Sequence, residues 1–93
     1  MSDAPILHVV AGTWDGGPIA TDELGDGFLH LCTEEQLEGE LDRYFADVTD
    51  VTILEVDAAV LGDALVWEEG EPGELYPHLY ATLPADAVLA TRR

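Results

Sequence analysis

The fold is decided by the stretch FLHLCTEEQLEGELDRYF, residues 28–45, in which a strand pattern passes directly into a helical one. Residues 28–32 form a mainly apolar run that predicts a β-strand. Thr33 and Gln36 have the spacing of a capping box, in which each side chain accepts a hydrogen bond from the other residue's backbone N–H. Apolar residues then recur at every fourth position, at Leu37, Leu41 and Phe45. The stretch therefore predicts a helix from about Thr33 to Phe45 that packs on a sheet through this stripe.

On both sides of this stretch, short β-rich runs alternate with turn residues. Runs of strand composition span residues 6–10, 51–56, 65–69, 78–82 and 87–91. One short helical turn is expected at residues 57–61, ended by Gly62, and a glycine-rich connection covers residues 12–27. The pattern predicts an α+β fold: one small domain, residues 1–93, with about six short strands in a curved or split sheet and one main helix.

The composition is strongly acidic, which limits the classes of partner. The 93 residues include 20 Asp and Glu against 3 Lys and Arg, for a formal net charge of −17. Such a surface repels phosphate backbones and anionic lipids, so we expect neither a nucleic-acid nor a membrane partner. The apolar content of 47% is ordinary for a globular protein, and no bilayer-spanning run or signal-peptide pattern is present. With one cysteine no intrachain disulfide can form, so we expect a cytoplasmic protein whose oligomeric state stays open.

The three histidines of the chain all lie in apolar, strand-like runs, at positions 8, 30 and 78. Strand alternation places His78 on the same face as Tyr80, and a face with imidazole and phenol groups is typical of a cleft rather than of a dry core. Glu68, beside Trp67 in another apolar run, is a candidate general base or a ligand for a hydroxyl group. We therefore expect His30, His78, Tyr80 and Glu68 to form one small-molecule site.

Each of these residues also has a purely structural interpretation. An imidazole in a strand can hydrogen-bond a backbone carbonyl at a core edge, and Glu68 can be one more acidic surface residue. The capping box accounts for Thr33 and Gln36, and burial as a small hydrophobe accounts for Cys32. The histidines and Glu68 have the chemistry of metal ligands, but no two share the close spacing of a metal motif within one element. The sequence therefore assigns no metal site.

Three motifs together resemble a known family. They are DGFLHLCTEEQ at residues 26–36, the pair Trp67-Glu68, and YPHLY at residues 76–80. With them the chain resembles the small bacterial proteins of domain-of-unknown-function family 952. These proteins carry Ile, Ser and Phe where this chain has Leu29, Thr33 and Tyr76. That family is distantly similar to the ADP-ribosyltransferase-like fold.

The resemblance implies roles for particular residues. In ADP-ribosyltransferase-like chemistry a histidine of the first strand binds a ribose, which points to His8, and a residue of a following strand assists, which points to His30 with Thr33. A later glutamate orients the ribose hydroxyl and stabilises an oxocarbenium-like centre, and this role falls on Glu68. The resemblance implies NAD as a substrate and leaves any cofactor open. Apart from the C-terminal arginines, Arg43 is the one cation available to hold a pyrophosphate.

Taken together, these patterns predict a small-molecule cleft lined by His, Tyr and Glu side chains, in a nucleotide- or NAD-related transferase or hydrolase. The catalytic candidates are Glu68, His30 and His78. The candidate ligand-binding residues are His8, Thr33, Gln36, Trp67 and Tyr80. The alternatives are a non-catalytic ligand-sensing or protein-interaction module and a histidine-based metal-binding protein.

Overall fold

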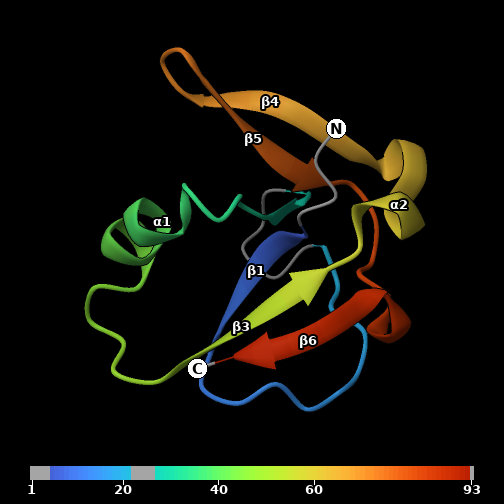
Figure 1. Ribbon diagram of the computed structural model, residues 1–93, viewed down its shortest axis with the longest axis horizontal. Helices are drawn as coiled ribbons and strands as arrows, with labels where there is room; N and C mark the ends of the chain where they lie inside the picture. Colours follow the sequence, from blue (N-terminus) through green and yellow to red (C-terminus); the bar gives the residue numbers. More distant parts are fainter. Residues whose placement is uncertain (1–4, 22–26, 93) are drawn as a thin grey trace.

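Six strands form two antiparallel three-stranded sheets in the computed structural model, which describes residues 5–21 and 27–92 (Figure 1). One sheet has the order β1-β3-β6 and consists of Ile6–Ala11, Val51–Val56 and Val88–Arg92. The other has the order β2-β5-β4 and consists of Leu29–His30, Glu74–Leu79 and Leu65–Glu71. The helices are α1, Leu37–Tyr44, and the single turn α2, Ala58–Leu61, with 3₁₀ turns at Gly62–Ala64 and Ala85–Ala87. The predicted α+β class, with six strands, a split sheet and one main helix, is confirmed.

The segment that follows β2 joins the two sheets. The Leu31 N–H donates to the Pro77 carbonyl of β5 at 3.0 Å. One residue later the partner changes, because Cys32 exchanges two backbone hydrogen bonds, of 2.7 and 2.9 Å, with Leu7 of β1. This short segment therefore fixes the position of β2 against both sheets.

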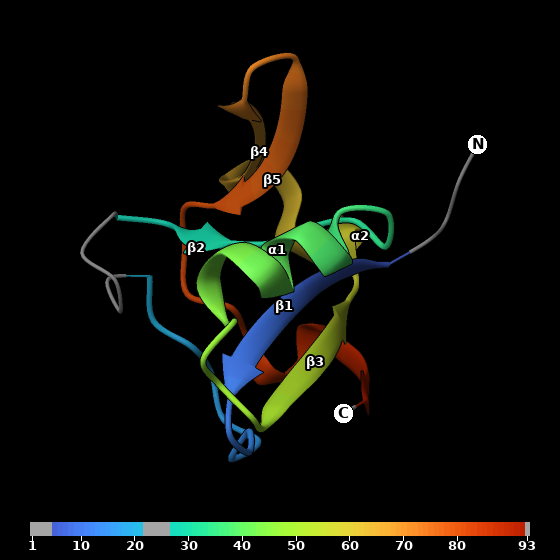
Figure 2. The same ribbon diagram turned by 90° about the vertical axis from the view of Figure 1, so that its left-hand side faces the viewer.

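The core divides into two apolar clusters, one on each face of the β1-β3-β6 sheet. The first cluster lies between the two sheets and includes Ile6, Leu54 and Val56 on one side and Leu29 and Leu79 on the other. The second lies under α1 and contains Leu7, Val9, Cys32, Ile53 and Tyr76. Strand alternation explains the division, since neighbouring residues of β1 point to opposite faces. Figure 2 shows α1 lying against β1.

Helix α1 is shorter than predicted, although its capping box is present. The Gln36 N–H donates to Thr33 Oγ1 at 3.3 Å, and the Thr33 N–H donates to Gln36 Oε1 at 2.9 Å. The first turn is closed by tighter hydrogen bonds that span three residues, so the α-helix proper begins at Leu37 rather than at Thr33. The stripe of Leu37, Leu41 and Phe45 packs against the second cluster, but each side chain is only partly buried.

The prediction for the fifth strand is wrong in its bounds, because β5 spans Glu74–Leu79 rather than residues 78–82. A turn at Pro72-Gly73 pairs β4 with β5 from Glu74 onward, so the strand begins before Pro77. The Pro77 carbonyl faces Leu31, so the position without an N–H faces the short β2 side and not the β4 ladder. The second strand is also shorter than predicted, since only Leu29–His30 pairs regularly with β5.

The remaining predicted elements lie within two residues of the observed ones. The Asp57 side chain caps α2 by accepting from the Ala59 N–H at 3.0 Å, and Gly62 ends it at a φ of 58° that favours glycine. No helix in the described part of the chain is both long enough and apolar enough to cross a membrane.

Candidate functional site

Two histidines meet because they lie directly opposite each other in the sheet. His30 of β2 pairs with His78 of β5, and their ring centroids are 5.4 Å apart in an edge-on arrangement. Phe28 stacks on the His78 ring at 4.2 Å between centroids and also contacts the His30 ring at 4.9 Å. The predicted proximity of the two imidazoles is confirmed. Phe28, which shares the strand face of His30, was missed as a site residue although alternation placed it there.

A carboxylate and a phenol complete this cluster. His78 Nδ1 lies 2.7 Å from Glu68 Oε1, and the Tyr80 hydroxyl donates to the same oxygen at 2.6 Å. The bond from Tyr80, and then the bond from His78, lower the pKa of Glu68, while the bond to Glu68 raises the pKa of Tyr80. Glu68 is therefore a carboxylate at neutral pH and accepts a hydrogen bond from His78 Nδ1–H, which leaves His78 Nε2 for other partners.

His8 lies on the other side of β2. Its Nδ1–H donates to the backbone carbonyl of His30 at 2.9 Å, and the side chain is buried. This is the contact that the structural interpretation of a strand histidine predicts. The bond also ties β1 to β2 beside the site.

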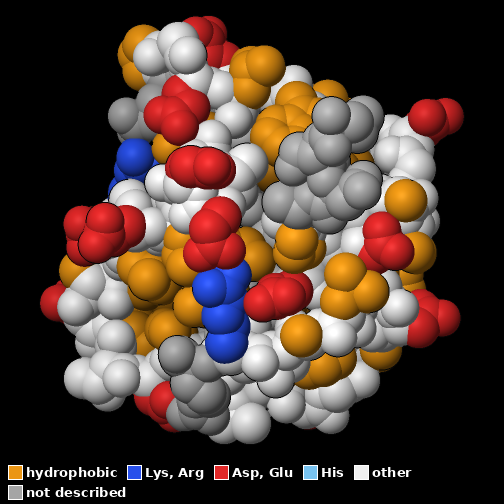
Figure 3. Space-filling model, in the orientation of Figure 1, with side chains coloured by type: hydrophobic (Ala, Val, Ile, Leu, Met, Phe, Trp, Pro, Cys, Tyr) orange, Lys and Arg blue, Asp and Glu red, His pale blue; other side chains and the backbone are white. Residues whose placement is uncertain are grey.

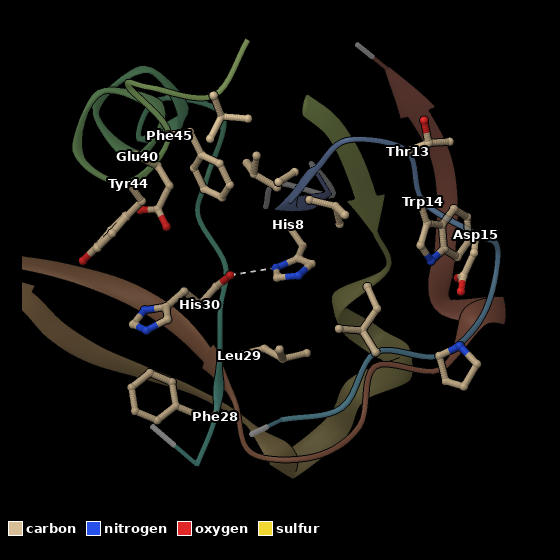
Figure 4. Close-up of a pocket in the computed structure, with 16 residues that line it drawn as sticks. His8, Thr13, Trp14, Asp15, Phe28, Leu29, His30, Glu40, Tyr44 and Phe45 are labelled. Atoms are coloured by element: carbon tan, nitrogen blue, oxygen red, sulfur yellow. Dashed lines mark hydrogen bonds between the residues drawn. The ribbon is translucent and has the colours of Figure 1, made fainter. Parts of the chain in front are cut away.

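Two cavities adjoin this cluster. The larger, of about 650 Å³, is lined by β1, β2, helix α1 and the segment after β1 (Figure 4). The smaller, of about 170 Å³, is lined by His78, Arg43 and Tyr76 among others. His30, Glu40 and Tyr44 line both cavities. These three side chains therefore lie between the two cavities, and His30 connects the histidine cluster to both.

Glu40 is the site residue that sequence reasoning missed most clearly. It lies on α1 with its side chain directed towards His30 (Figure 4), it lines both cavities, and only 6% of the residue is exposed. Burial raises the pKa of Glu40, against the opposing attraction of His30, Arg43 and His78. The sequence did contain an indication of this position. Gln36, Glu40 and Tyr44 follow one another at four-residue spacing, which places them on one side of the helix next to the apolar stripe.

Four of the five predicted ligand-binding residues lie outside the lining of both cavities, namely Thr33, Gln36, Trp67 and Tyr80, and so does the catalytic candidate Glu68. The Gln36 side chain donates to the Leu75 carbonyl at 2.8 Å and so ties α1 to β5. Thr33 is engaged in the capping box, and Trp67 is 44% exposed on β4. Trp67 and Glu68 are neighbours in a strand and point to opposite faces, so the aromatic ring beside His78 and Tyr80 is Phe28 and not Trp67.

The described residues do not favour a metal site or a reactive thiol. Residues 5–21 and 27–92 contain no group of three or more His, Cys, Asp or Glu side chains arranged to hold a metal ion. Cys32 is buried, as predicted, and burial together with Glu40 and Glu34 raises the pKa of its thiol to about 12. It is therefore a thiol and not a thiolate at neutral pH.

Fold and site together define a class: a small α+β protein with two three-stranded sheets and a histidine cluster beside a cavity. The comparisons with known proteins assign this class to a family. Residues 10–91 match the model for "Protein of unknown function (DUF952)", so the chain belongs to that family, as the three sequence motifs predicted.

Solved structures of one bacterial protein share this fold. The crystal structure of protein CC0527 from Caulobacter crescentus is 30% identical, with a TM-score of 0.84, over 94% of this chain and 82% of that one. Its solution NMR structure is 29% identical, with a TM-score of 0.78, over 95% of this chain and 82% of that one. No curated protein matches the chain. None of these comparisons includes an ADP-ribosyltransferase, so the distant similarity to that fold stays a prediction.

Proposed function

We propose that this protein binds a small organic molecule in the cavity between α1 and strands β1 and β2, and that it acts on this molecule by acid–base chemistry at its histidines. The substrate class to test first is nucleotide- or NAD-derived compounds, and the reaction class is transfer or hydrolysis. The cavity of about 650 Å³ is within the usual range of ligand sites, roughly 300–1,000 Å³. Its volume suits a molecule of nucleoside size.

The observation that carries the proposal is the pairing of His30 and His78, with ring centroids 5.4 Å apart: His30 lines the larger cavity, and both histidines line the smaller one. Two imidazoles at this separation can act as acid and base on the same substrate when one of them is held in a fixed tautomer. Glu68 supports this for His78, since its carboxylate accepts a hydrogen bond from Nδ1–H with an N···O distance of 2.7 Å. A lowered pKa makes Glu68 a poor base, so its role in the proposal is to position His78 and to stabilise the imidazolium.

Charge limits the part of a nucleotide that the cavity can hold. A pyrophosphate needs cationic or N–H partners, and the chain offers three arginines against 20 acidic residues. Of these, Arg43 lines the smaller cavity and Arg92 is paired with Glu34 at 2.6 Å. The proposal therefore places the base and ribose of a nucleotide-derived substrate in the larger cavity and leaves any phosphate towards Arg43 or solvent.

A thermal-shift screen with NAD, ADP-ribose, nucleosides and nucleotides tests binding. A ligand at 100 times its Kd should stabilise the fold by about 2.7 kcal/mol. Each hit is then incubated with the protein and followed by chromatography for a cleaved or transferred product. His78→Ala and Glu68→Gln should lose turnover, whereas Glu35→Gln, which removes one exposed carboxylate from the same protein, should keep it.

The outcomes separate the enzyme from its alternatives. Binding with turnover that is lost in His78→Ala supports an enzyme. Binding without turnover favours the ligand-sensing module and would contradict the catalytic part of the proposal. No stabilisation by any member of the panel would contradict the substrate class.

A further inference from the structure

The Glu40 carboxylate has surroundings that are unusual for a buried acid. It lines both cavities and is more than nine-tenths buried. Its side chain makes no hydrogen bond among the described residues, and the groups that attract it are the charges of His30, Arg43 and His78. Its oxygens are not sealed inside the protein, so a ligand in the cavity can reach them.

The rest of the larger cavity matches a positively charged partner. Aromatic rings line it on several sides, from Trp14, Phe28, Tyr44 and Phe45. Figure 4 shows Glu40, Tyr44 and Phe45 on one side of the cavity and Trp14 with Asp15 on the opposite side. Asp15 brings a second carboxylate. Among the described residues that line the cavity there is neither Lys nor Arg.

We propose that the larger cavity binds a small organic cation, whose ammonium or iminium group is held by the Glu40 carboxylate and by the surrounding aromatic rings. Aromatic faces attract such cations through their ring quadrupole, and a desolvated carboxylate attracts them more strongly than an exposed one. This inference rests on the proposed binding function and names the substrate class of that same site as cationic. It also excludes an anionic group from this cavity.

The charge of the whole protein favours the same class of ligand. The formal net charge of −17 attracts cations towards the surface and repels anions. On the face drawn in Figure 3, acidic side chains are spread over many elements, and the few basic side chains are bordered by acidic ones. This long-range attraction is screened by salt, whereas an ion pair inside the cavity is screened much less. Salt therefore separates binding at Glu40 from attraction to the surface.

The experiment compares two molecules of nearly the same shape. Choline carries a quaternary ammonium group, and 3,3-dimethylbutan-1-ol is its neutral carbon counterpart. Each is titrated into ¹⁵N-labelled protein at pH 7.5 in 0.3 M NaCl and followed by two-dimensional NMR. The Trp14 indole N–H, which donates to the Gly17 carbonyl at 2.9 Å, is a reporter inside the lining of the cavity.

Choline should shift the Trp14 indole signal and bind at least tenfold more tightly than the alcohol. Glu40→Gln should weaken choline binding at least tenfold, whereas Glu38→Gln, on the exposed side of the same helix, should leave it within twofold. The proposal is overturned if the alcohol binds as well as choline, or if Glu38→Gln weakens binding as much as Glu40→Gln. It is also overturned if choline does not bind while a neutral nucleoside does, a result that leaves the proposed function standing.

Discussion

Glu40→Gln should make the protein more stable at neutral pH, which is unusual for a substitution of a buried residue. The carboxylate is 6% exposed and has no hydrogen-bond partner among the described residues. Its burial raises its pKa, and each unit of such a shift corresponds to about 1.4 kcal/mol of lost stability once the group is ionised. The glutamine amide has the same shape but no charge, and it leaves its own polar atoms unpaired. We therefore expect Glu40→Gln to raise both the urea midpoint and the Tm at neutral pH.

The gain should depend on pH in a defined direction. The folded protein holds the Glu40 proton more tightly than the unfolded chain does, because its pKa is raised from the ordinary value of 4.5. Stability of the native sequence is therefore lost as the pH rises from 4.5 through the raised pKa, and the loss is complete above it. Glu40→Gln has no proton to lose, so its advantage should be largest near pH 7–8. It should shrink as the pH falls towards 4.5.

Urea unfolding followed by tryptophan fluorescence, at pH 7.5 and at pH 4.5, measures this difference. Glu38→Gln is the matched control, because it removes the same charge from an exposed position of α1 and should change stability by less than about 0.5 kcal/mol. If Glu40→Gln is less stable than the native sequence at pH 7.5, the carboxylate is a structural partner of its neighbours, and the reasoning about an unpaired acid is refuted. An equal gain in Glu38→Gln would mean that the relief comes from net charge alone.

Four further predictions concern the fold and its surface. Leu79→Ala should cost about 3–5 kcal/mol in urea unfolding, because Leu79 is fully buried between β2 and β4; a cost below 1 kcal/mol would mean that the first cluster is not the core. Thr33→Ala should cost about 1 kcal/mol by removing one half of the capping box, and a neutral result would show that the turn before α1 does not need it. Cys32, with a pKa of about 12, should not react with Ellman's reagent at pH 8 until urea unfolds the protein, and rapid reaction of the folded protein would contradict its burial. The urea midpoint should rise between 0.02 M and 1 M NaCl, because salt screens the repulsion within a chain of net charge −17; an unchanged midpoint would mean that the charges are already well spaced.

The sequence was sufficient to predict the helices and strands that are marked by the composition or capping residues of the segment itself. Strands β1, β3 and β6 follow from β-branched and apolar runs, and the capping box marked the region where α1 begins. Bounds were less accurate where a tertiary contact decides them. The hairpin turn at Pro72-Gly73 extends β5 to Glu74, and the change of partner at Cys32 limits β2 to two residues. Neither contact can be inferred from a single run of residues.

The candidate site was predictable to the extent that it follows strand alternation. His30, His78, Glu68 and Tyr80 were expected together, and the structure places them in one cluster. Glu40 was missed because one more glutamate on an acidic helix looks like a surface residue. Its spacing from Gln36 and Tyr44 was the one indication in the sequence, and the docking of α1 decides that this side of the helix turns inward. The larger cavity was also beyond sequence reasoning, since four separate segments line it.

The same strand pairing that buries the core also sets the geometry of the histidines. Leu29 and Leu79 are opposite partners inside the first cluster, and His30 and His78 are the next pair along the same ladder. Because side chains alternate, a slip of β2 by one residue would expose Leu29 and turn His30 away from His78. The pairing of β2 is only two residues long, so its register depends on the backbone bonds that follow it, from Leu31 to Pro77 and between Cys32 and Leu7. The histidine pair is therefore held by the join between the two sheets, and any substitution that loosens this join should separate the imidazoles before it unfolds the domain.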